Sequence, residues 1–100
     1  MPKIYEYLGI ILFFYSKEHE PIHVHARKGE YESKVEFLIE NGEIHKVIIT
    51  NVKGSMPLKG KDLKNLKIFI MNYSDSIVNK WVDYFIYNKG IEFERITKKI

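Results

Sequence analysis

Histidines are concentrated in one short stretch of the chain, and they are the residues best suited to chemistry. Three of the four histidines lie within the segment Ser16-Lys17-Glu18-His19-Glu20-Pro21-Ile22-His23-Val24-His25. Histidine changes its charge near neutral pH and also binds divalent metals, so such a cluster can transfer protons or hold an ion. Cysteine is absent, which excludes disulfides, thiol nucleophiles and thiolate metal sites.

The spacing of these residues predicts that they share one face of a β-sheet. Alternation along a strand over residues 22–27 places His23, His25 and Arg27 on the same side. Pro21 is rigid, and we expect it to bring the preceding Glu18 and His19 to that side. A two-residue turn at Lys28-Gly29 would then set three cross-strand pairs: Arg27 with Glu30, His25 with Glu32 and His23 with Lys34.

Three interpretations of this face remain open from the sequence. Neutral imidazoles two residues apart on a strand can share one divalent ion, with His19 or Glu32 as a third ligand. Alternatively, the face can cleave RNA through its 2′-hydroxyl without a metal, because imidazoles and Glu18 suit proton transfer and Arg27 suits the phosphate. The third interpretation is structural: histidines beside glutamates form ordinary cross-strand pairs and need no substrate.

The rest of the first half has the pattern of hairpin strands. Strands are expected at residues 4–7 and 10–15 around a tight turn at Leu8-Gly9, and again at 30–40 and 43–50. Asn41-Gly42 favours a type I′ turn, which needs positive φ at both central residues. Across this turn we expect four pairs: Glu40 with Glu43, Ile39 with Ile44, Phe37 with Lys46 and Val35 with Ile48.

From residue 61 to 88 the apolar period becomes helical. The stripe that would cover the sheet consists of Leu63, Leu66, Ile70, Tyr73, Ile77, Trp81, Tyr84 and Phe85. Ser74-Asp75-Ser76 interrupts it, so the helix is either continuous or broken, with Ser74 as the N-cap of a second helix. Residues 91–97 alternate and predict a last short strand or a docking tail.

Together these elements predict one α+β domain over residues 1–100. We expect an antiparallel sheet of about four to five strands built from hairpins, with one long or broken C-terminal helix packed on one face. The longest apolar run, Leu8 to Tyr15, is far shorter than the ~20 residues of a membrane helix. We therefore interpret it as a buried strand, and expect a soluble, cytoplasmic protein that does not contact a membrane.

Charge is unevenly distributed along the chain. The first 51 residues carry six Lys and Arg against eight Asp and Glu, a net charge of −2, whereas residues 52–100 carry ten against five, a net charge of +5. A basic half of this kind suits RNA, DNA or an acidic protein partner. It equally suits a lysine-rich helix face that contacts only water.

The histidine segment also resembles a known family. The stretch Phe13-Phe14-Tyr15-Ser16-Lys17-Glu18-His19-Glu20-Pro21-Ile22-His23-Val24-His25 looks like the signature Phe-x-x-Ser-x-Glu-His-x-Pro-x-His-Val-His of a small prokaryotic family, domain of unknown function 4160 (DUF4160). The opening Met1-Pro2-Lys3-Ile4 and the helical Trp81-Val82-Asp83-Tyr84-Phe85 are similar too, so the resemblance covers roughly residues 1–88. The chain departs from the pattern in its Asn41-Gly42 hairpin and in the tail after Gly90.

The resemblance implies a function class. Members are often encoded beside another small protein, and some are labelled as toxins of type II toxin–antitoxin pairs. It therefore implies a toxin-like protein with a small protein antitoxin as partner. The residues that carry over are Ser16, Glu18, His19, Pro21, His23 and His25.

The leading hypothesis is a toxin-like protein that acts on RNA or translation, as a candidate metal-independent ribonuclease. His19, His23 and His25 would form its catalytic site, with Glu18 and Arg27 assisting. No cofactor is expected, and a divalent metal, if one binds, would use the same three histidines. The alternative is a non-enzymatic binding module, either a metal-binding regulator or an antitoxin-like protein.

Overall fold

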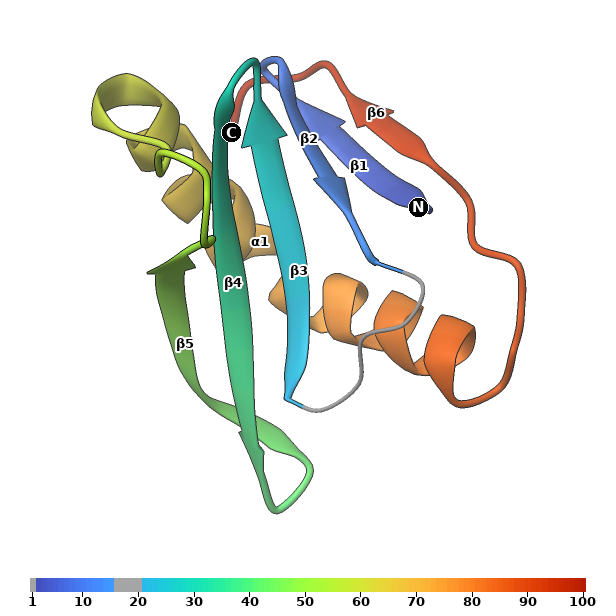
Figure 1. Ribbon diagram of the computed structural model, residues 1–100. Coiled ribbons are helices and arrows are strands. Elements are labelled where there is room, and N and C mark those ends of the chain that lie inside the picture. Colours follow the sequence, from blue (N-terminus) through green and yellow to red (C-terminus); the bar gives the residue numbers. More distant parts are fainter. Residues whose placement is uncertain (1, 16–20) are drawn as a thin grey trace.

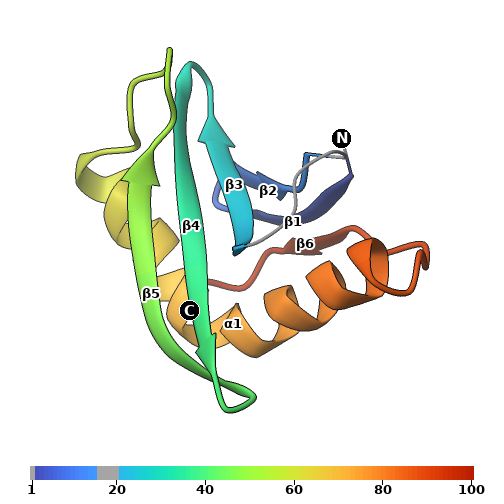
Figure 2. The same cartoon turned by 60° about the horizontal axis from the view of Figure 1, so that its bottom comes forward.

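The computed structural model describes residues 2–15 and 21–100. Its strands form a six-stranded sheet in the order β5-β4-β3-β2-β1-β6, and α1 crosses one face of this sheet (Figures 1 and 2). The fold is therefore α+β with a mostly antiparallel sheet, as the sequence predicts. The elements are β1 (Lys3–Tyr7), β2 (Ile10–Phe13), β3 (Ile22–Lys28), β4 (Tyr31–Glu40), β5 (Glu43–Asn51), α1 (Gly60–Phe85) and β6 (Glu94–Ile96).

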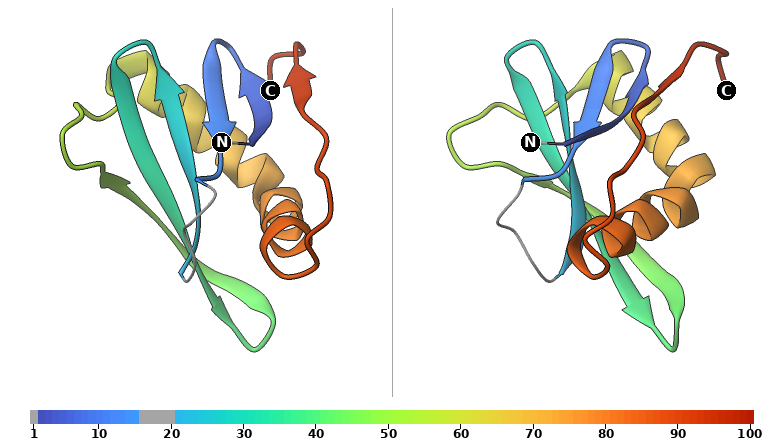
Figure 3. Two further views of the ribbon diagram at one scale, coloured as in Figure 1. Left: turned by 45° about the vertical axis from the view of Figure 1, so that its right-hand side comes forward. Right: turned by 90° about the vertical axis from the view of Figure 1, so that its right-hand side faces the viewer.

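The sixth strand exceeds the expected four to five. β6 pairs in parallel with β1, so that Tyr5 lies opposite Glu94. After α1 the chain turns back and returns along the sheet to reach β1 (Figure 3). Hairpin signals reveal only pairings between neighbours in the chain, so the sequence left residues 91–97 as either a strand or a tail.

α1 is one continuous helix of 26 residues. Ser74 does not cap a second helix, because its Oγ donates a hydrogen bond to the carbonyl of Ile70 one turn earlier. That local bond satisfies the hydroxyl without interrupting the helix. Within the residues that the structure describes, no helix combines the length and the apolar composition that a membrane crossing requires.

Alternation along the strands gives the sheet two different faces. Val24 and Val35 point toward α1 and join the main apolar core, in which Phe69 of the helix contacts the rings of Tyr5 and Tyr7. Phe13 is also fully buried, yet it lies on the opposite face and outside that core. The face opposite α1 therefore has a buried cluster of its own.

The β4–β5 hairpin confirms the predicted turn but not the whole predicted register. Asn41 and Gly42 have φ values of 53° and 81°, as a type I′ turn requires. The pairs of Glu40 with Glu43 and Ile39 with Ile44 are confirmed.

Beyond those two pairs a bulge between Leu38 and Ile39 shifts the register by one residue. Phe37 faces Val47 and Val35 faces Ile49, so the predicted partners Lys46 and Ile48 are wrong. The bulge keeps apolar β5 residues on the α1 side, where the predicted register would have placed a lysine.

The connection from β5 to α1 is attached to the start of β4. The backbone N–H of Glu32 donates to the carbonyl of Met56 at 2.9 Å. The backbone N–H of Leu58 donates to Oγ of Ser33 at 3.0 Å, and both residues are buried. These bonds hold the segment before α1 against the strand that carries Glu32.

Candidate functional site

The β3–β4 hairpin turns at Gly29-Glu30, not at Lys28-Gly29. Lys28 pairs with Tyr31, and Gly29 has a φ of 61°, which favours glycine. Every pair is therefore shifted by two residues from the prediction. The observed pairs are Arg27 with Glu32, His25 with Lys34 and His23 with Glu36.

This shift leaves the predicted face intact. A slip of one residue would have turned the strand over, but a slip of two returns each side chain to the same side. Glu30 is the exception, because it lies exposed in the turn and takes no part in the site. We call the resulting surface the histidine face and define it by Phe13, Tyr15, His23, His25, Arg27, Glu32 and Lys34.

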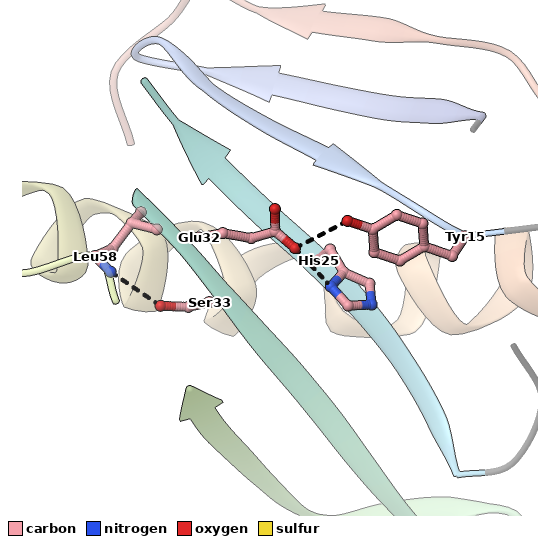
Figure 4. Close-up of polar contacts among 5 residues, drawn as sticks. All are labelled: Tyr15, His25, Glu32, Ser33 and Leu58. Carbon is pink, nitrogen blue, oxygen red and sulfur yellow. Dashed lines mark hydrogen bonds and ion pairs between the residues drawn. The ribbon is translucent and has the colours of Figure 1, made fainter. Parts of the chain in front are cut away.

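His25 and Glu32 form the centre of the histidine face. Nδ1 of His25 lies 3.2 Å from Oε2 of Glu32, and the hydroxyl of Tyr15 donates to the same oxygen at 3.2 Å (Figure 4). The two residues are not direct cross-strand partners, so the contact is diagonal, which long side chains can reach. Because an ionised carboxylate only accepts hydrogen bonds, Nδ1 of His25 carries the proton.

His23 lies beside this pair and is oriented by the backbone. Its Nδ1 donates to the carbonyl of Pro21 at 2.6 Å, and since a carbonyl can only accept, Nδ1 must carry the proton here too. The ring centroids of His23 and His25 are 5.3 Å apart. In each imidazole Nε2 is then the nitrogen that carries no proton when the ring is neutral.

Aromatic rings enclose His25 on the sheet. The ring of Tyr15 meets it edge to face with centroids 4.3 Å apart, and Phe13 stacks on it at 5.6 Å. The guanidinium of Arg27 lies 5.1 Å from the centroid of Phe13. His25 is 3% exposed and Glu32 is 6% exposed. The hydrogen bond between these two side chains therefore lies in a buried environment, which strengthens electrostatic interactions.

Two cations lie at the surface of the histidine face. Arg27 and Lys34 are half-buried, and Nζ of Lys34 lies 3.8 Å from Oε2 of Glu36. Arginine presents a planar donor fork and lysine a point charge, and both residue types are common phosphate ligands in proteins. The face thus combines titratable imidazoles with cations on adjacent strands.

The structure brings together only part of the predicted site. His23, His25 and Arg27 share the histidine face, whereas Glu18 and His19 lie outside the described residues. Among residues 2–15 and 21–100, no group of three His, Asp or Glu side chains is arranged to hold a metal ion. The three-histidine metal site therefore depends on His19 and stays a prediction.

Sequence reasoning missed the aromatic members of the site. The sequence pattern places Tyr15 only in a buried strand, but in the structure its hydroxyl donates to Glu32 and its ring packs on His25. Its parity with Phe13 was the available signal, since residues two apart on an extended chain share a face. To place Tyr15 beside His25, however, one must also know that Phe13 pairs with His25. The sequence between β2 and β3 contains no turn motif that predicts this pairing.

The family described as domain of unknown function (DUF4160) matches residues 9–82 of the chain. This match covers about three quarters of the sequence, including β2 to β5 and most of α1. The chain belongs to the DUF4160 family. The opening Met1-Pro2-Lys3-Ile4 and the helix end at Tyr84-Phe85 lie outside the matched residues. No curated protein and no solved structure matches the chain.

Proposed function

We propose that this chain is the toxin-like component of a type II toxin–antitoxin pair and that it acts in the cytoplasm on RNA through the histidine face. The observation that carries the proposal is the pair formed by His25 and Glu32 at 3.2 Å, with the ring of His23 beside it. A carboxylate that fixes the tautomer and orientation of an imidazole is the usual arrangement of a histidine that transfers protons. The resemblance to toxin-labelled proteins supports the same class.

The proposed reaction needs a base, an acid and a cation. One imidazole removes the proton from the RNA 2′-hydroxyl, and the oxygen attacks the adjacent phosphorus. The 5′-oxygen leaves and takes a proton from the second imidazole, so the products are a 2′,3′-cyclic phosphate and a 5′-hydroxyl. His23 and His25 would share these roles, with Glu18 and His19 as further candidates.

Arg27 and Lys34 would receive the phosphate. Their side chains lie at the surface, whereas the imidazoles lie mostly below it, so the phosphate meets the cations first. Both cations can stabilise the charge that develops on the phosphoryl oxygens. Glu32 would act as a positioning residue, because it touches His25 and not the reacting atoms.

Induced expression in a bacterial host tests the proposal. We expect wild-type protein to arrest growth and to degrade total RNA, and His23→Ala/His25→Ala to do neither. Glu32→Gln removes the charge behind His25, whereas Glu30→Gln makes the same change in the exposed turn, at a residue that takes no part in the site. We expect the first to lose toxicity and the second to keep it.

Purified protein gives the chemical readout. Cleavage of a defined RNA should continue in the presence of a chelator and leave 2′,3′-cyclic phosphate ends. Circular dichroism establishes that each variant is folded. If wild-type protein is harmless to the host and leaves RNA intact, or if the folded double variant is as toxic as wild type, the proposal fails.

One observation favours a second candidate, a non-enzymatic binding module. His23 is 8% exposed and His25 3%, and both imidazoles hydrogen-bond within the fold, which is how structural histidines behave. On this hypothesis His25→Ala lowers the melting temperature, while growth and RNA are unaffected by wild type and variant alike. Calorimetric titration with zinc or nickel separates a metal-binding regulator from a module that binds only protein.

A further inference from the structure

β5 is a free edge of the sheet. The strand runs over nine residues, Glu43–Asn51, with β4 on one side and, in the described part of the chain, no strand on the other (Figures 1 and 2). Every second backbone N–H and C=O therefore points outward without a strand partner. A row of such groups is a template for another strand.

The two edges of the sheet differ in how they are protected. β6 has only three residues, two of them charged, and Glu94 and Arg95 are held in ion pairs with Lys80 and Glu6. β5 is three times as long, and its centre is the apolar run 47–49 without proline or glycine. Short, charged strands resist edge-to-edge pairing, and long apolar ones favour it.

An apolar groove continues the β5 edge onto α1. It has a volume of about 450 Å³ and lies between the strand residues Val47 and Ile49 and the helix residues Ile70 and Met71. Val47 is 38% exposed and Met71 is 82% exposed. A strand added to β5 would cover both, because its inward side chains would enter this groove.

We propose that β5 pairs antiparallel with β5 of a second copy of this chain, about a two-fold axis at Ile48. This register sets Val47 opposite Ile49 of the second copy, so the apolar side chains of both copies meet over the two grooves. On the other side Ile48 meets itself and Lys46 meets Thr50. The same axis sets His45 opposite Asn51 of the second copy, twice by symmetry, and directs Glu43 toward the turn after β5 that carries Lys53.

The pattern of charge along β5 favours a second copy of the chain as the partner, paired in the register centred on Ile48. No like charges lie opposite each other about Ile48, and the end of each strand that carries the exposed Glu43 meets the end that leads to the exposed, oppositely charged Lys53. An axis at Val47 would instead set Lys46 against Ile48 and His45 against Ile49. Since β5 carries one acidic and one lysine residue, it complements itself better than it complements a strongly charged peptide.

Sedimentation velocity over a concentration series tests the proposal on the purified protein. We expect wild type to form a dimer. Ile48→Lys sets two lysines opposite each other beside Lys46, and we expect a monomer. Ile86→Lys is the matched control, because it adds the same charge at an exposed isoleucine outside the groove. Ile86 lies about 18 Å along the helix axis from Ser74, the last helix residue that lines the groove. We expect this variant to remain dimeric.

A charge exchange tests the register itself. If Ile48 meets Ile48, a mixture of Ile48→Lys and Ile48→Glu should form a heterodimer, which an affinity tag on one variant would capture. This outcome also shows that the lysine variant is folded. A monomeric wild type, a dimeric Ile48→Lys or a mixture that does not associate would overturn the proposal. Dimerisation is measured on purified protein without RNA or host cells. Its outcome therefore tests the dimer proposal independently of the toxin proposal.

Discussion

The buried hydroxyl of Ser33 allows a quantitative test of how β4 packs against the segment before α1. Ser33→Ala removes the acceptor of the Leu58 N–H, a bond of 3.0 Å between residues that are 0% and 2% exposed. A buried donor that loses its acceptor costs about 1–3 kcal/mol. For a chain of this size, with an unfolding entropy near 0.2 kcal/mol/K, the melting temperature should fall by about 5–14 °C.

Thr50→Val is the matched control for this substitution. Oγ1 of Thr50 is also buried, but it has no hydrogen-bond partner among the described residues. Replacing it with a methyl group of similar volume leaves no group newly unsatisfied, so the melting temperature should stay the same or rise.

The melting temperatures of both variants are measured by thermal unfolding at the same protein concentration. Circular dichroism reports the helix and sheet, and fluorescence reports Trp81, which is buried and is the single tryptophan of the chain. Equal shifts for the two variants would refute the reasoning. A fall of less than about 3 °C for Ser33→Ala would refute it as well, because the unpaired N–H would then cost well under 1 kcal/mol.

Three further predictions concern other parts of the fold. Phe13→Ala should cost about 3–5 kcal/mol in urea unfolding although its side chain faces away from α1, whereas Phe93→Ala, at a 42% exposed position, should change stability by less than about 1 kcal/mol. Gly42→Ala should cost about 1–2 kcal/mol, because a side chain is strained at φ 81°, and Gly90→Ala, where φ is not positive, should be nearly neutral. Burial raises the pKa of Tyr5 above the ordinary value of 10.0, so the folded state holds this proton more tightly than the unfolded chain. Stability should therefore fall as the pH rises above about 10, and Tyr5→Phe should reduce that fall.

Local patterns in the sequence predicted most of the fold. Asn41-Gly42 fixed one hairpin because its backbone requirement is met by few other residue pairs, and the helical period identified α1. The pairing of β6 with β1 could not be predicted in this way, because it joins segments about 90 residues apart. Its energy comes from tertiary contacts, and a short alternating run fits a tail equally well.

The candidate site shows which errors in register matter. The β3–β4 turn was misplaced by one residue, which shifted every pair by two and kept His23, His25 and Arg27 on the predicted face. Across β4–β5 a bulge shifted the pairs by one, and there the predicted partners of Phe37 and Val35 were wrong. Where the turn residues are ambiguous, as at Lys28-Gly29-Glu30, the sequence leaves the register open, whereas burial of one face encodes parity strongly.

The order of the strands has a consequence for how the chain folds and opens. β1 to β5 each pair with their neighbour in sequence, so five strands can assemble by successive hairpin closures at low entropic cost. β6 cannot join until α1 has turned the chain back, and it contributes three residues. It should therefore dock last and exchange its amide hydrogens through local opening, at a lower free energy than β3 and β4. The outer edge of β1 is protected only while β6 remains docked. Local detachment of β6 would therefore expose the backbone N–H and C=O groups along that edge of β1.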